Sequence, residues 1–176
     1  MSESTHLPPP QHPGLPLDVR LRPALVSRLH LNGLFCGLPL PALVEMAAFA
    51  GFDFVVIDNE HGMASFETTE HLLRAARASG IMPIVRCFET DIPRLLDAGA
   101  SGIKVPMVQS PEQAQRIAQR IRYPRPPSQE GLSGLRGSAF STRAAGYGAF
   151  GGPGHTDRSN ELLGLIVMLE TPQAIE

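Results

Sequence analysis

The chain has 176 residues, 43% of them hydrophobic and 18% charged, values typical of a globular protein with a sizeable core. A formal net charge of −2, without basic runs interleaved with aromatics, argues against a nucleic-acid partner. Cys36 and Cys87 show no CxxC spacing, which argues against a disulfide framework or a zinc site. No apolar run approaches the roughly 20 residues that cross a bilayer. We therefore expect a soluble, cytoplasmic protein that binds no membrane.

The first 23 residues are rich in proline and predict a disordered arm outside the folded domain. They lack a cationic segment followed by an apolar one, so a signal peptide is not expected. The predicted domain covers residues 24–176. It opens with a short helix at 24–31, which Asn32-Gly33 would end.

Strand-like and helix-like segments alternate from residue 34 onward. Strands are predicted at 34–38, 54–58, 82–87, 102–106 and 163–169. Helices are predicted at 41–50, 65–79, 91–98 and 110–122, from their apolar spacing and from capping residues such as Ser65 and Ser110. Residues 123–160, rich in glycine and proline, predict one long irregular connection, and Thr171-Pro172 would begin another helix.

This alternation with short connections is typical of a parallel sheet with right-handed crossovers. The predicted fold class is α/β, a TIM (β/α)8-type barrel of which about the first five βα units are present. Five units in roughly 145 residues scale to eight in about 230, close to the ~250 residues usual for such a barrel. We therefore expect a chain that is truncated at its C-terminal side.

Polar groups follow three of the predicted strands: Asp58, Glu60 and His61 after one, Arg86 at the end of the next, and Glu170 after the last. Each has a simpler explanation, as a solvated loop residue, a surface salt bridge, or an acid at a helix start. In a barrel, however, all the carboxyl strand ends meet at one face, where catalytic residues lie. Their recurrence at successive strand ends favours a shared site.

The residue types suit chemistry that passes through an enolate. Glu170 could bind Mg²⁺ or a similar hard cation, which would polarise the carbonyl of a 2-oxo acid. Arg86 adds a fixed positive charge for the same oxygen. His61 can move a proton near neutral pH, and Asp58 is placed to orient its ring.

Several motifs occur in the order found in one aldolase family. The segment around Gly51 to His61 resembles the signature AGFDxxxIDxEH of the metal-dependent HpcH/HpaI aldolases. The further matches are Pro83-Ile84-Val85-Arg86, then 97–108, then Arg122-Tyr123-Pro124, and finally Glu170-Thr171. The resemblance spans roughly residues 33–176. The family is in turn similar to citrate lyase β-type barrels.

The resemblance implies a class II aldolase that reversibly cleaves a 4-hydroxy-2-oxo acid to pyruvate and an aldehyde. It implies His61 as acid/base, Asp58 as its hydrogen-bonding partner and Arg86 as the contact of the enolate oxygen. Glu170 would be the first metal carboxylate and Glu60 an outer-shell residue of the Mg²⁺, Mn²⁺ or Co²⁺ site. The family's hexamers imply a homo-oligomer.

The sequence also departs from the family pattern. Met168 stands where a glutamine usually precedes the metal glutamate, and Asn59 replaces a glycine. The family's second metal carboxylate, in a GPxDL motif, would fall beyond Glu176. The alternatives are therefore an aldolase present here as a fragment, a shortened inactive paralogue that serves as an oligomer partner, or another pyruvate-enolate enzyme resembling macrophomate synthase.

Overall fold

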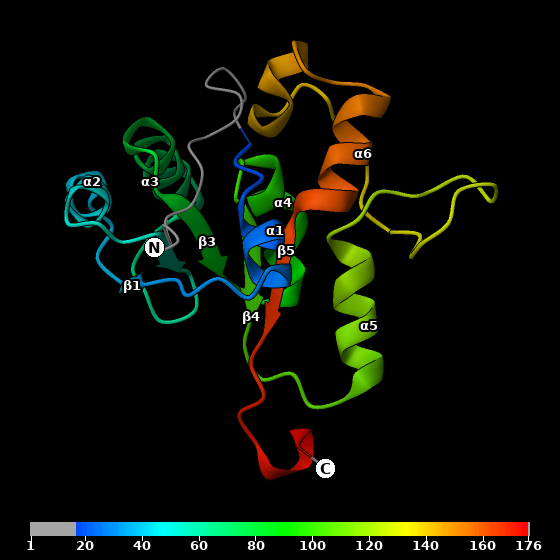
Figure 1. Cartoon of the computed structure of the whole chain (residues 1–176), viewed down its shortest axis with the longest axis horizontal. Helices are drawn as coiled ribbons and strands as arrows, with labels where there is room; N and C mark the ends of the chain where they lie inside the picture. Colours follow the sequence, from blue (N-terminus) through cyan, green and yellow to red (C-terminus); the bar gives the residue numbers. More distant parts are fainter. Residues whose placement is uncertain (1–16, 176) are drawn as a thin grey trace, which may run out of the picture.

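A computed structural model describes residues 17–175 and shows a five-stranded parallel sheet with helices packed around it (Figure 1). The strands are β1 (Gly33–Cys36), β2 (Phe54–Asp58), β3 (Met82–Arg86), β4 (Gly102–Val105) and β5 (Gly164–Val167). Their order in the sheet is β1-β2-β3-β4-β5, and each pairs in parallel with the next. A doubly wound sheet would reverse its order, whereas a (β/α) barrel winds in one direction. The predicted α/β, barrel-type fold is confirmed for these five strands.

The helices alternate with the strands, and α2 to α5 lie where the sequence predicts helices. They are α1 (Leu21–Val26), α2 (Pro41–Phe49), α3 (Phe66–Ser79), α4 (Ile92–Asp97), α5 (Pro111–Arg120) and α6 (Pro153–Leu162), with 3-10 turns η1 (Glu89–Asp91), η2 (Arg143–Gly148) and η3 (Pro172–Ala174). The predicted caps form, since Ser65 Oγ accepts from the Thr68 amide and Ser110 Oγ from the Gln113 amide. Among the helices described, none is long and apolar enough to cross a membrane.

Alternation along the strands gives the sheet two different faces. Val55, Ile57, Val85 and Ile103 belong to the larger buried cluster, together with apolar side chains of α2 to α5. Val56, Met82 and Ile84 belong to a smaller cluster with Leu21 of α1. The first face is the outer, helix-covered face of the barrel wall, and the second is its inner face.

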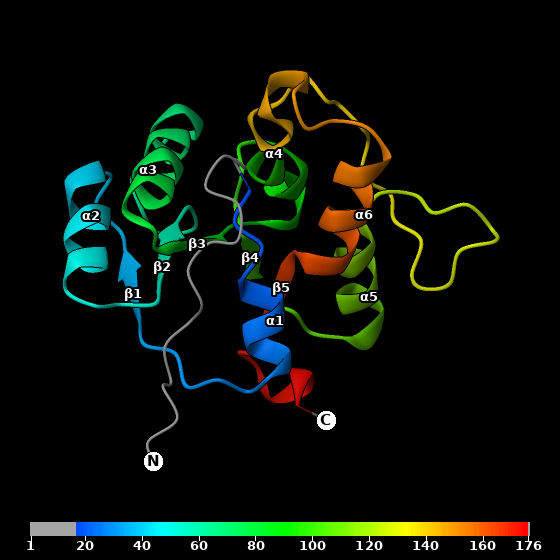
Figure 2. The same cartoon turned by 45° about the horizontal axis from the view of Figure 1, so that its top comes forward.

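Helix α1 covers the inner face at the start of β4 and β5 (Figures 1 and 2). Leu21 is fully buried there. A Cβ added to Gly102 would lie 2.3 Å from Leu21 Cδ2, and one added to Gly164 would lie 2.5 Å from the same atom. The two strands therefore begin with glycine because the leucine takes the space of a side chain.

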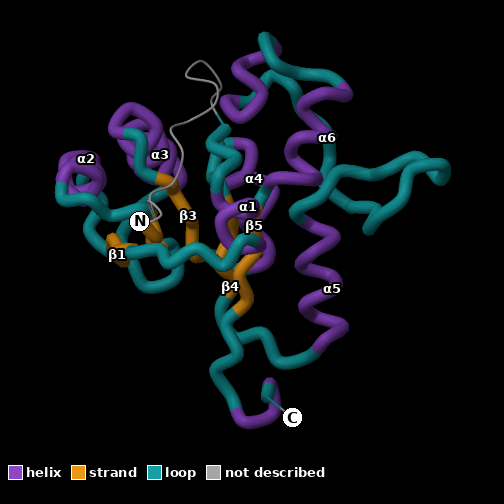
Figure 3. The backbone as a smooth tube through the Cα atoms, in the orientation of Figure 1, coloured by secondary structure: helices purple, strands orange, loops and turns teal. Residues whose placement is uncertain are grey.

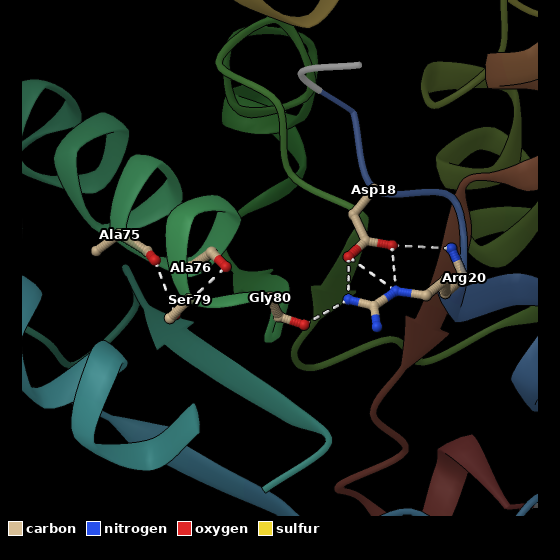
Figure 4. Close-up of polar contacts among 6 residues, drawn as sticks. All are labelled: Asp18, Arg20, Ala75, Ala76, Ser79 and Gly80. Atoms are coloured by element: carbon tan, nitrogen blue, oxygen red, sulfur yellow. Dashed lines mark hydrogen bonds and ion pairs between the residues drawn. The ribbon is translucent and has the colours of Figure 1, made fainter. Parts of the chain in front are cut away.

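The predicted boundary of the domain at residue 24 is too late. Leu17 and Asp18 are buried, and α1 begins at Leu21 rather than at residue 24. Arg20 forms an ion pair with Asp18 and donates from Nη2 to the Gly80 carbonyl at 2.7 Å, which ties this segment to the end of α3 (Figure 4). Pro23 does not block the helix because first-turn amides have no intrahelical acceptor. Residues 1–16 of the predicted arm lie outside the described residues.

The prediction of one irregular connection over residues 123–160 is also wrong in part. Figure 3 shows a long loop after α5, but η2 and α6 follow it. The buried residues of α6 are His155, Ser159 and Asn160, so the helix shows no apolar period. Asn160 Oδ1 accepts from the Tyr123 amide at 2.7 Å, and Tyr123 Oη lies 3.2 Å from His155 Nε2. Polar contacts of this kind carry no periodic signal in the sequence.

Candidate active site

The loop after β2 is shaped by the carboxylate of Asp58. Asp58 Oδ1 accepts from the backbone amides of Glu60 at 3.1 Å and His61 at 3.2 Å, which turns the chain sharply after the strand. A Cβ added to Gly62 would lie only 2.0 Å from the Asp58 carbonyl oxygen, so the turn requires glycine there. The strand end and its loop thus form one fixed unit.

Asp58 and Arg86 are direct neighbours in the register of β2 and β3. Arg86 donates from Nε to Asp58 Oδ1 at 2.9 Å and from Nη2 to Oδ2 at 2.6 Å, a bidentate pair. The two side chains are only 9% and 12% exposed. The pair is therefore largely shielded from solvent.

The pair changes the titration of both groups. Burial alone would raise the pKa of the Asp58 carboxyl, but the hydrogen bonds from Arg86 and from the two loop amides outweigh it and hold that pKa below its ordinary value. The hydrogen bond with Asp58 raises the pKa of Arg86 further, against the effect of burial, with smaller contributions from Glu60 and Glu170. Both groups are therefore charged at neutral pH.

The structure corrects one predicted contact. The Asp58 carboxylate binds Arg86 and not the imidazole of His61. The nearest carboxylate to that ring is Glu60, whose Oε1 lies 3.7 Å from His61 Nε2 and whose Oε2 lies 3.2 Å from Arg86 Nη1. The His61 side chain is 73% exposed. Glu60 is therefore the carboxylate that can orient the imidazole of His61, because both carboxylate oxygens of Asp58 accept hydrogen bonds from Arg86.

Glu170 lies beyond the end of β5, and its Oε2 accepts from the backbone amide of Met107 at 2.8 Å. Since Met107 follows the end of β4, Glu170 lies by the carboxyl ends of β4 and β5. As an exposed carboxylate it fits one ligand of a hard divalent cation. Within residues 17–175, no group of three His, Cys, Asp or Glu side chains could hold a metal.

Two further residues on the inner face, Phe35 and Lys104, are not predicted by the sequence pattern as members of the site. The Phe35 ring of β1 lies beneath two cations, with Arg86 Cζ 5.0 Å and Lys104 Nζ 4.6 Å from its centroid. Lys104 pairs in register with Arg86 across β3 and β4. The alternation of Ile103, Lys104 and Val105 could have assigned the lysine to the inner face. Nothing in the sequence indicated that Phe35 would reach across β2 to both cations.

Comparisons with known proteins agree on one family. The chain matches the HpcH/HpaI aldolase/citrate lyase family over residues 31–176. It is 33% identical to a hydroxypyruvate/pyruvate aldolase of Cupriavidus necator, over 92% of this chain and 58% of that protein. It is 35% identical to a hydroxypyruvate/pyruvate aldolase of Deinococcus radiodurans, over 92% of this chain and 56% of that protein.

A solved structure shows the same fold. The HpcH/HpaI aldolase/citrate lyase family protein of Burkholderia cenocepacia superposes with a TM-score of 0.75 at 31% identity, over 82% of this chain and 56% of that one. The chain thus spans little more than half the length of the relatives it matches. From the family match over most of its length and from its five-stranded barrel wall, the chain belongs to the HpcH/HpaI aldolase/citrate lyase family.

Proposed function

We propose that the protein is a pyruvate aldolase that reversibly cleaves a 4-hydroxy-2-oxo acid to pyruvate and an aldehyde. The C3–C4 bond breaks, the C4 hydroxyl loses its proton, and the electron pair passes to the oxygen on C2 as an enolate. A proton then returns to C3 to give the methyl group of pyruvate. The observation that carries the proposal is the Arg86 guanidinium, fixed at the carboxyl end of the sheet by Asp58 and Glu60, with Glu60 also next to His61.

Arg86 is suited to the charge that develops on the C2 oxygen. Asp58 holds Nε and one hydrogen of Nη2, and Glu60 lies next to Nη1. A guanidinium carries five N–H donors, so at least one hydrogen on each of Nη1 and Nη2 has no hydrogen-bond partner among residues 17–175. A donor fixed in advance near a developing oxyanion stabilises the transition state without reorganisation.

His61 is the group that we assign to proton transfer. Its ring is exposed at the same strand ends, with Glu60 between it and Arg86. An imidazole can remove and return a proton near neutral pH, at the C4 hydroxyl or at C3. A divalent cation such as Mg²⁺, Mn²⁺ or Co²⁺, held in part by Glu170, would supply a Lewis acid for the carbonyl.

The exchange of pyruvate methyl protons with D₂O tests the enolate step without a choice of aldehyde. We expect exchange, followed by proton NMR, in the presence of Mg²⁺, Mn²⁺ or Co²⁺. His61→Gln should slow it about 10²- to 10⁴-fold, the usual contribution of general acid–base catalysis. Because the ring is exposed, the variant should unfold at the wild-type urea concentration. Absence of exchange in folded wild-type protein, or equal rates in the variant, would reject the proposal.

No observation specifically favours either alternative function, an inactive paralogue or another pyruvate-enolate enzyme. An inactive paralogue that serves as an oligomer partner would not need the Asp58–Arg86 pair and the neighbouring His61 in one place. A macrophomate synthase-like reaction would share the enolate and would also give exchange, so products formed with candidate aldehydes must distinguish it. Assembly as a homo-oligomer such as a hexamer, and a location in the cytoplasm, are further proposals.

A further inference from the structure

Helix α6 is polar on the face that it buries. Its buried residues are His155, Ser159 and Asn160. The His155 ring is only 2% exposed, so its surroundings are formed by this chain itself. Histidine is the side chain whose charge ordinarily changes between about pH 5 and 8. A helix that is attached through a buried histidine therefore has a contact that can respond to pH.

Two of these residues attach α6 to Tyr123, which follows the end of α5. Asn160 Oδ1 accepts from the Tyr123 amide at 2.7 Å, and Asn160 Nδ2 donates to the Tyr123 carbonyl at 3.2 Å. Tyr123 Oη lies 3.2 Å from His155 Nε2. The rings of Tyr123 and Phe140 meet the His155 ring edge to face, with centroids 5.8 and 6.0 Å away. The imidazole is thus enclosed by two aromatic rings and one hydroxyl.

The charged groups around His155 disfavour a proton on its ring. Arg136 Cζ lies 4.4 Å from the centroid of the Tyr123 ring, and Arg158 lies three residues further along α6. The acidic group that acts on His155 is Asp97, but its Oδ1 already accepts from Arg136 Nη2 at 2.6 Å. Among residues 17–175, no carboxylate forms an ion pair with His155.

These surroundings change the titration of both rings. Burial, followed by the charges of Arg136 and Arg158, lowers the pKa of His155 from its ordinary value, and the opposing effect of Asp97 is smaller. Burial raises the pKa of Tyr123, so its hydroxyl carries no charge near neutral pH that could pair with an imidazolium. The contact between the two side chains therefore requires a neutral histidine.

Helix α6 also supports the elements on either side of it. Leu163 alone separates it from β5, the strand that precedes Glu170. Arg22 of α1 donates from Nη1 to the Glu161 carbonyl near the C-terminal end of α6. Release of α6 would therefore loosen the start of β5 and one attachment of the helix that covers the inner face.

We propose that His155 is a pH-dependent switch, which holds α6 against Tyr123 when it is neutral and releases α6 when it is protonated, while the sheet stays folded. A proton on the enclosed ring adds a positive charge that Arg136 and Arg158 repel, and opening moves that charge into water. Because the opened state binds the proton more readily than the closed state, opening becomes more favourable as the pH falls below about 6.5. The switch is independent of the proposed aldolase reaction.

Hydrogen exchange of the Tyr123 amide, followed by NMR on the whole chain, measures the release, because this amide donates to Asn160 only while α6 is attached. After correction for the intrinsic exchange rate, its protection factor should fall about 10- to 30-fold from pH 7 to pH 5, the effect of one proton taken up on opening. The buried amide of Cys87, which donates to the Lys104 carbonyl, should remain about tenfold or more better protected than Tyr123 at pH 5.

Two variants separate His155 from other titrating groups. His155→Gln keeps a hydrogen-bond acceptor for the Tyr123 hydroxyl but takes up no proton, so its Tyr123 protection factor should agree within about threefold at the two pH values. The control His71→Gln removes an exposed histidine of α3 and should keep the full fall. A constant protection factor in wild type, or an undiminished fall in His155→Gln, would overturn the proposal.

Loss of Cys87 protection in parallel with Tyr123 would also overturn it, because the acid transition would then be global unfolding. Ring-proton NMR of the wild type gives a test that needs no variant. The His155 resonance should titrate at a lower pH than that of the exposed His71, and equal midpoints would reject the switch.

Discussion

Replacement of Asp58 by asparagine is the sharpest test of the polar pair at the sheet end. Asp58→Asn keeps the shape of the side chain, and its Oδ1 can still accept from the Glu60 and His61 amides. It removes the charge and the Oδ2 acceptor that lies 2.6 Å from Arg86 Nη2. The new amide also presents N–H donors to a guanidinium that has only donors.

The loss in the free energy of unfolding depends on which contacts Arg86 keeps after Asp58→Asn. A hydrogen bond to a charged group contributes about 1.5–3 kcal/mol, and loss of a buried ionic partner costs about 3–5 kcal/mol. Arg86 keeps Glu60 as a partner at 3.2 Å, and both side chains of the original pair are slightly exposed. We therefore expect the free energy of unfolding to fall by roughly 2–3 kcal/mol.

Urea unfolding at neutral pH measures this loss, and an exposed ion pair provides the matched control. Glu70 and Arg74 are paired on the surface of α3, with side chains 35% and 43% exposed. Glu70→Gln should cost less than about 0.5 kcal/mol. A loss in Asp58→Asn no larger than that of the control would refute the conclusion that the Asp58–Arg86 pair is protected from solvent.

The pH dependence of the same experiment has a defined sign. The folded-state pKa of Asp58 is lowered, so its contribution is complete above the ordinary value of about 4 and is lost as the pH falls through the folded-state pKa. The difference in stability between wild type and Asp58→Asn should therefore shrink below about pH 4 and be constant between pH 5 and 7. A difference that grows on acidification would contradict the lowered pKa.

Three further substitutions probe other parts of the molecule. Arg86→Lys, which cannot make the bidentate pair, should lower kcat for pyruvate proton exchange about 10²- to 10³-fold; a change below threefold would contradict its role. Gly102→Ala should cost about 1–3 kcal/mol by urea unfolding, and less in a Leu21→Ala background, because its Cβ meets Leu21 Cδ2; equal costs would exclude that clash. Tyr123→Phe removes the hydroxyl that contacts His155 and should cost about 1 kcal/mol by the same method, whereas no loss would mean that water replaces the contact.

Local patterns in the sequence determined the strands and the crossover helices. Buried parallel strands need continuous apolar residues, which is why Phe54–Asp58 was predictable with its bounds. Ser65 and Gly80 mark the two ends of α3, because a hydroxyl acceptor and a residue with positive φ satisfy the helix termini. The position of Asp58 and Arg86 at neighbouring strand ends followed from the parallel order alone.

Only the tertiary structure decided which charged groups meet. Sequence spacing suggested that Asp58 would hold the ring of His61, three residues away, but the strand register brings Arg86 closer to it. Contacts such as Leu21 against Gly102, or Phe35 beneath Lys104, join segments about 70–80 residues apart. Each of these residues fits its own helix or strand, so the local sequence does not indicate the contact. Periodicity and capping report on neighbours within a few residues, whereas ion pairs and inner-face packing depend on how the strands lie side by side.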